Sequence, residues 1–139
     1  MATFESVSAI VRNTYKEIWN DWYPVSSARA WVQVDLSDEC SRYSHANNLI
    51  VIAVAEGNLD DQDILDKDAW PIWKIELVHE MLHEWRARIP CVVTSEAEAL
   101  CTKYKPAACG DGHGSDFFQA IVEKASYFGM TPEQLAMKI

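Results

Sequence analysis

The sequence predicts an α+β fold in which a small, mainly antiparallel sheet packs on helices. Three observations predict it. Apolar residues recur at helical spacing over residues 3–22, alternate or run together between residues 31 and 55, and return to helical patterns from residue 69 onward. The chain has 139 residues and shows neither an internal repeat nor a linker. We therefore expect residues 1–139 to form a single domain with one hydrophobic core.

The first half of the chain holds one predicted helix and the predicted strands. The helix covers residues 3–22 and ends before Pro24. Its apolar face is spaced by three, four or seven positions and consists of Phe4, Val7, Val11, Ile18 and Trp22. Residues 31–36 alternate, which predicts a strand with one buried face, and residues 40–44 are expected to form a short second strand. The continuous apolar run at residues 49–55 predicts a strand covered on both faces.

The second half of the chain is predicted to be helical. A helix is expected over residues 69–89, with Asp68 as its N-cap. The segment Ser95–Glu98 resembles a capping box and is expected to open the next helix. A further helix is predicted over residues 115–128. Thr131 is expected to cap a short last helix that has proline at its first position.

Composition narrows the class of protein. The chain carries 21 acidic and 12 basic residues, a net charge of −9, with no cluster of basic and aromatic residues, so we expect no direct nucleic-acid binding. No apolar run is long enough to span a membrane, and residues 1–5 lack the start of a signal peptide. We therefore expect a cytoplasmic protein. Its cysteines are then expected to be free thiols, although export by another route would permit disulfides; they are Cys40, Cys91, Cys101 and Cys109.

The motif that carries chemistry lies at residues 78–85, Val-His-Glu-Met-Leu-His-Glu-Trp. On a helix, His79 and His83 lie one turn apart on the same face, so both rings can reach one metal ion. Glu80 is placed beside them to accept a proton from water. Two ligands at this spacing with an adjacent carboxylate are the pattern of zinc peptidases. The apolar neighbours indicate a buried helix, in which unpaired polar side chains would be costly.

A catalytic zinc site needs a third protein ligand. His113 is one candidate, because flanking glycines allow the backbone to approach a metal closely. Glu96 or Glu98 would give a site with two histidines and one carboxylate instead, although Glu98 has an alternative use in the predicted capping box. A further possibility, whose spacing matches no familiar zinc finger, is a structural zinc site formed by Cys101, Cys109 and His113.

Two segments together resemble a known family. His79-Glu80-Met81-Leu82-His83, followed by His113-Gly114-Ser115-Asp116-Phe117, resembles the SprT-like (Spartan-type) metallopeptidases, whose pattern is His-Glu-x-x-His and then His-Gly-x-x-Phe/Trp. The resemblance implies a zincin-like fold with the motif on a central helix and a Zn²⁺ cofactor. It implies His79, His83 and His113 as zinc ligands and Glu80 as the catalytic base. The activity implied is hydrolysis of peptide bonds in a protein or peptide substrate.

The sequence departs from this family in two ways. The distance from His83 to His113 is long, so residues 86–111 look like an insertion. Family members that cleave proteins crosslinked to DNA use basic or separate DNA-binding regions, which this acidic chain lacks, so the family's substrate is not carried over to it.

Other functions stay open at this stage. Ser95-Glu96-Ala97-Glu98-Ala99 is similar to the glutamate-bearing helix of ImmA/IrrE-type peptidases, which would make a glutamate the third ligand. A catalytically inactive, zinc-stabilised protein-interaction module is a second alternative, although Glu80 would then have little reason to be present. A metal-dependent hydrolase of non-peptide amides is a third.

Overall fold

The computed structural model describes residues 3–24, 29–37, 40–55, 69–104 and 113–139 of the chain. These residues divide into two compact units, Met1–Met81 and Leu82–Ile139. Helix α2 (Ile72–Arg88) belongs to both, because it runs without interruption through the boundary. We describe each unit by itself.

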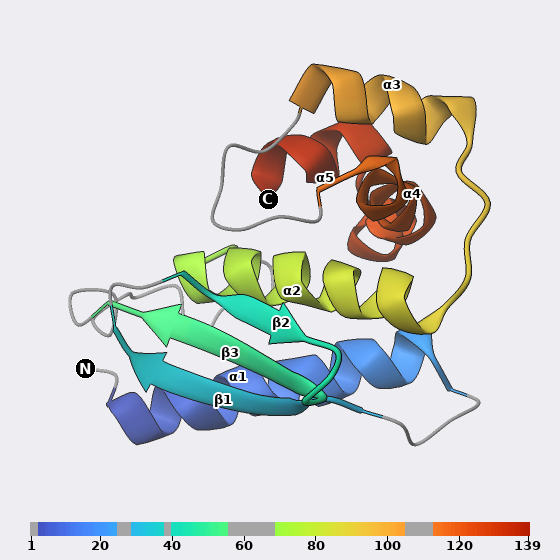
Figure 1. The fold of residues 1–139 in the computed structure, drawn as a ribbon. Coiled ribbons are helices and arrows are strands. Elements are labelled where there is room, and N and C mark those ends of the chain that lie inside the picture. Colours follow the sequence, from blue (N-terminus) through green and yellow to red (C-terminus); the bar gives the residue numbers. More distant parts are fainter. Residues whose placement is uncertain (1–2, 25–28, 38–39, 56–68, 105–112) are drawn as a thin grey trace. The chain divides into compact units, whose positions relative to one another are not determined.

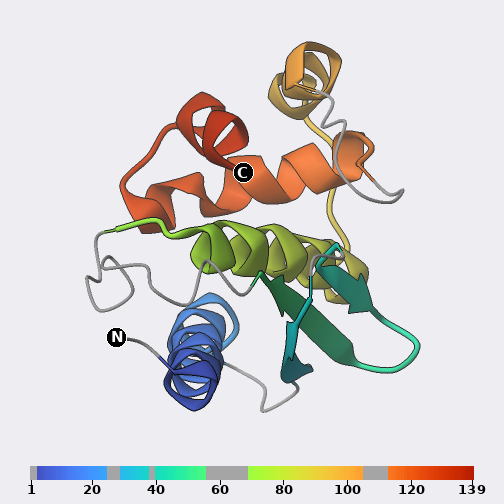
Figure 2. The same cartoon turned by 90° about the vertical axis from the view of Figure 1, so that its left-hand side faces the viewer.

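The first unit contains helix α1 (Phe4–Trp22), the sheet and the first part of α2. The Thr3 hydroxyl accepts from the Ser6 N–H, and the Ser6 side chain bonds back to Thr3, so a capping box opens α1. Four residues of the predicted apolar face of α1 are buried, namely Val7, Val11, Ile18 and Trp22, whereas Phe4 at its first turn is half-buried. α1 runs beside strand β1 (Trp31–Leu36) on one face of the sheet (Figures 1 and 2).

Three strands form a mixed sheet within the described residues, in the order β1-β3-β2. Strand β3 (Leu49–Val54) pairs with β1 in parallel along its whole length and with β2 (Arg42–Ser44) in antiparallel fashion over three residues. The α+β class is confirmed, but the expectation of a mainly antiparallel sheet is wrong. After β1 the chain continues to β2 at the far edge of the sheet. A hairpin then leads to β3, which lies between β1 and β2 and runs parallel to β1.

The two long strands show the burial that their sequences predict. Val32 and Val34 of β1 are buried and pair with Ile50 and Ile52, so these four side chains share one face. Every residue of β3 after Leu49 is buried, as the continuous apolar run predicted. The hairpin before β3 turns at Asn48, whose φ of 52° is in the left-handed region that asparagine tolerates.

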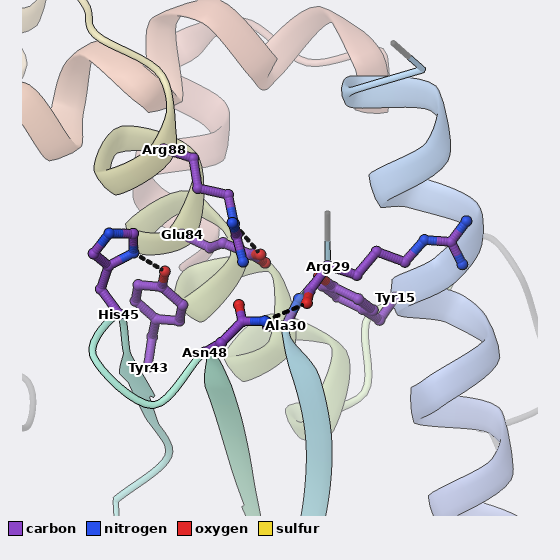
Figure 3. A network of polar contacts seen from close by, with 8 residues as sticks. All are labelled: Tyr15, Arg29, Ala30, Tyr43, His45, Asn48, Glu84 and Arg88. Atoms are coloured by element: carbon purple, nitrogen blue, oxygen red, sulfur yellow. Dashed lines mark hydrogen bonds and ion pairs between the residues drawn. The ribbon is translucent and has the colours of Figure 1, made fainter. Parts of the chain in front are cut away.

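A buried hydrogen bond joins α1 to the start of β1. The Tyr15 hydroxyl accepts from the Ala30 N–H at 2.7 Å, and close by the Asn48 side chain donates to the Arg29 carbonyl at 2.7 Å (Figure 3). Arg12 adds a second link, since its Nε donates to the Val32 carbonyl at 3.0 Å.

The second unit is helical among its described residues. It contains the end of α2, α3 (Ser95–Tyr104), α4 (Ser115–Lys124), the 3₁₀ turn η3 (Ala125–Phe128) and α5 (Pro132–Lys138). Helix α4 contacts both α3 and α5 (Figure 1). The buried apolar side chains of these three helices include Ala97, Leu100, Phe117, Phe118, Ile121 and Leu135.

The predicted helix ends can be compared with the structure. Gly129 ends η3 in the left-handed conformation. Thr131 caps α5 with Pro132 at the first turn, as predicted. The Ser95–Glu98 capping box is wrong. The cap of α3 is Thr94, whose Oγ1 accepts from Ala97 N at 3.3 Å. The proposed N-cap of α2, Asp68, lies outside the described residues.

Two further sequence predictions concern the membrane and the cysteines. None of the helices described is both long and apolar enough to cross a bilayer. Cys91 and Cys101 are free, as predicted. Cys40 is disulfide-bonded, so the prediction of a free thiol is wrong there. Disulfides are rare in reducing compartments, and this one weighs against the cytoplasmic location, which stays a prediction.

We expect Tyr15→Phe to lower the free energy of unfolding by about 1–2 kcal/mol, because it leaves the buried Ala30 N–H without its acceptor. Urea denaturation measures the effect. Tyr127→Phe, at a ring that is 42% exposed, is the control and should change the free energy by less than about 0.5 kcal/mol. Equal effects of the two substitutions would contradict a structural role for the Tyr15 hydroxyl.

Candidate metal centre

Helix α2 sets the relation between the first two histidines. It begins after Pro71, whose carbonyl accepts from Lys74 N and Ile75 N, and it buries Leu77, Val78, Met81 and Leu82. His79 and His83 lie one turn apart on this one continuous helix, as the motif predicted. His79 is buried and His83 is half-buried. The motif helix is therefore confirmed, with residues 72–88 helical rather than the predicted 69–89.

His113 meets His83 from the segment that precedes α4. Their Nε2 atoms lie 3.2 Å apart. The His113 carbonyl lies 3.9 Å from the Cys101 thiol on α3, and Gly114 serves as the N-cap of α4 in an extended conformation. The contact between the two rings joins parts of the chain that are 30 residues apart.

Phe117 of α4 packs against both rings. Its centroid lies 4.5 Å from that of His83 with the planes tilted by 31°, and 5.1 Å from that of His113 in an edge-to-face arrangement. The Phe117 side chain is fully buried. It therefore limits how far either imidazole can rotate.

The three histidines form a group that could hold a metal ion. One nitrogen from each of His79, His83 and His113 lies within 4.8 Å of the others, and this is the group of metal-binding side chains found among the described residues. Two nitrogens on one tetrahedral zinc, each about 2.0–2.1 Å from it, lie roughly 3.3 Å apart. The 3.2 Å separation of the His83 and His113 nitrogens fits that geometry. Three neutral nitrogens leave a fourth position for water, which is the arrangement of a catalytic zinc site.

Glu80 follows His79 on α2 and is buried, with 7% of its surface exposed. Burial is the main cause that raises its pKa to about 8; the negative charge of Glu76 raises it further, and a hydrogen bond from the Tyr43 backbone N–H opposes both. A carboxyl in this setting is able to hold or release a proton near neutral pH. A divalent cation bound nearby would favour the ionised form.

A second carboxyl lies one turn before Glu80 on the same helix. Glu76 accepts from the Ser41 hydroxyl at 2.9 Å, and that hydroxyl accepts from the Ala53 N–H at 2.9 Å. Burial raises the pKa of Glu76. The two carboxyls thus tie α2 to the β2 edge of the sheet, through Ser41 and through the Tyr43 backbone. Sequence analysis missed Glu76, although its spacing of four residues from Glu80 was a visible signal.

The alternative ligands are placed elsewhere. Glu96 and Glu98 are exposed on α3 and do not belong to the histidine group. Cys101 faces the His113 backbone carbonyl rather than its ring, and Cys109 lies outside the described residues. His45 is exposed and bonds through Nδ1 to the Tyr43 hydroxyl at 2.8 Å (Figure 3).

Glu84, which follows the second motif histidine, is fully buried. Its carboxylate forms an ion pair with Arg88 at 2.7 Å, one turn later on α2 (Figure 3). A buried carboxylate is costly without such a partner. Glu84 therefore has a structural use within α2.

In comparisons with known proteins, no family model, curated protein or solved structure matches this chain. The resemblance to SprT-like peptidases has no support from these comparisons and stays a prediction.

We expect Glu80→Gln to stabilise the metal-free protein at neutral pH, by on the order of 2 kcal/mol. The raised pKa means that the folded state keeps a proton that the unfolded state releases above its ordinary value of 4.5. The contribution of Glu80 to stability is therefore fully present below about pH 4.5 and is lost as the pH rises toward 8.

Denaturation of both proteins in the presence of chelator, at about pH 4.5, 6 and 8, measures this difference. The advantage of the glutamine variant should grow with pH. An advantage that does not change with pH would show that Glu80 titrates normally in the folded protein.

Proposed function

We propose that this protein is a zinc-dependent metallopeptidase. The observation that carries the proposal is the convergence of His79, His83 and His113 on one point, with the buried Glu80 next to the first of them. The donor set suits Zn²⁺, because imidazole nitrogens are among its preferred ligands and three of them leave an open position. A zincin-like fold of the SprT-like type is part of this proposal.

The site residues would have the following roles. His79, His83 and His113 would hold the metal. Bound zinc would supply Lewis acidity, which makes water more acidic and polarises the scissile carbonyl. Glu80 would accept the proton of the attacking water on its carboxylate and donate it to the leaving amine. The ionised carboxylate that the first of these steps requires would be favoured by a cation bound nearby.

Contacts with the β2 edge of the sheet support the assignment of Glu80 as the base. The Tyr43 backbone N–H donates to its carboxylate, and Glu76 is held through Ser41. These contacts fix the position of the carboxylate. A base must lie within hydrogen-bond reach of the proton that it takes, and fixing its position in advance lowers the cost of reaching that geometry.

The substrate class proposed is a protein or peptide. The net charge of −9 gives no support for direct nucleic-acid binding. The glutamate-ligand alternative is not proposed, because the carboxylates of α3 are exposed and outside the histidine group. A catalytically inactive zinc-binding module remains the competing class.

The purified protein should bind about one zinc ion per chain, and His113→Ala should lose it. Two remaining histidines leave the ion held mainly by water. Glu98→Ala is the matched control and should keep full zinc, because its carboxylate is exposed. Elemental analysis after dialysis against zinc provides the measurement. Zinc retained by His113→Ala but released by Glu98→Ala would reverse the ligand assignment.

Glu80→Gln should retain zinc and lose hydrolysis of a denatured protein substrate by at least about a hundredfold, because an amide cannot accept the proton. Product formation by mass spectrometry, with and without chelator, reports the activity. A wild-type protein that binds zinc but cleaves none of a diverse peptide library would favour the inactive binding module.

A further inference from the structure

An ion pair joins the same two segments of the chain as the contact between His83 and His113. Arg86 of α2 bonds through Nη1 to Asp116 Oδ2 of α4. Arg86 lies three positions after His83, and Asp116 lies three positions after His113. The ion pair therefore connects the same two parts of the chain as the histidine contact, three residues further along each.

Asp116 uses both of its carboxylate oxygens. While Oδ2 pairs with Arg86, Oδ1 accepts from the Phe117 N–H at 3.0 Å. A Cβ at Gly114 would lie 3.3 Å from Oδ1, so glycine leaves room for the carboxylate over the first turn of α4. The guanidinium of Arg86 is thus linked through Asp116 to the backbone of the residue whose ring packs on both histidines.

Arg86 is partly shielded from solvent at this position. Its side chain is 31% exposed, and its Nε is buried without a hydrogen-bond partner among the described residues. A partly desolvated ion pair of this kind adds little net stability and can cost some, so global folding is a weak reason for it. It does fix a specific register between the two segments, because an arginine–carboxylate pair is directional.

The segment that this ion pair positions is the one that carries His113. Without a connection between α2 and the start of α4, the segment that carries His113 would be oriented by ring packing and by the Cys101 contact with its carbonyl. A metal site requires its ligand within a fraction of an ångström, and residues that orient ligands commonly change metal affinity by 10- to 100-fold.

We propose that the Arg86–Asp116 ion pair is a clamp that positions His113 as the third metal ligand. Arg86 and Asp116 are positioning residues, since neither contacts the metal. The inference deepens the proposed function and rests on its three-histidine site.

The test compares the zinc dissociation constants of single and double variants. Asp116→Asn and Arg86→Gln should each weaken zinc binding about tenfold. Lys103→Gln is the matched control, because Lys103 forms an ion pair with Glu133 in the same unit, across the same 30-residue separation, with side chains 61% and 51% exposed. Its zinc affinity should stay within about twofold of the wild type. The charge-reversed double variant Arg86→Asp/Asp116→Arg should bind zinc more tightly than either reversed single variant.

A spectroscopic readout separates positioning from general loosening. Loading with Co²⁺ in place of zinc gives intense visible absorption at a four-coordinate site and weak absorption at a six-coordinate, water-rich one. The clamp variants should lose part of the intense band, whereas Lys103→Gln should keep it. The denaturation midpoints of the metal-free variants should stay close to that of the metal-free wild type.

Three outcomes would overturn the clamp. One is an unchanged zinc dissociation constant and cobalt spectrum in Asp116→Asn. Another is an equal loss in the Lys103→Gln control. The third is an unfolded Asp116→Asn protein together with normal zinc binding by Arg86→Gln, which would assign the pair to folding alone. A wild-type protein that binds no zinc would instead remove the proposed function itself, so the two failures are distinguishable.

Discussion

The helical period of α2 is the constraint on which the candidate site depends. A rise of 1.5 Å per residue and 3.6 residues per turn place His79 and His83 on one face, whatever the rest of the chain does. The same period places Glu76 one turn before Glu80 and Arg86 nearly one turn after His83. One helix thus carries two candidate ligands, the proposed base, a second carboxyl and one partner of the proposed clamp.

Burying these groups together has electrostatic consequences. Desolvation favours the neutral form of a carboxyl, and two carboxyls on one face oppose each other's ionisation. The raised pKa of Glu80 follows from both causes. The fold limits the effect through donors from the β2 edge: the Ser41 hydroxyl on Glu76 and the Tyr43 backbone N–H on Glu80. A bound cation would act in the same direction as these donors. It would therefore offset part of the cost of ionising these two carboxyls.

His113 depends on a different kind of interaction. No helical period relates it to His83, so its position rests on contacts made along the start of α4. Phe117 supplies packing against both rings, and Asp116 supplies a directional bond to α2. Packing resists rotation of a ring but permits sliding, whereas an arginine–carboxylate pair resists sliding. The combination explains how a segment 30 residues away can be held to a helix with the precision that a ligand needs.

The sequence alone determined those features that depend on local periodicity and side-chain chemistry. It predicted α1, the three strands, α2 and its two histidines, because apolar spacing and motif spacing are written in consecutive residues. It also offered His113 as a candidate third ligand, from ligand chemistry rather than from geometry. Tertiary structure decided the rest. The parallel pairing of β1 with β3, the use of Thr94 rather than Ser95 as a cap, and the contacts of Glu76 all depend on which distant segments meet. Such pairings balance packing and hydrogen bonds over the whole chain, and no single stretch of sequence encodes that balance.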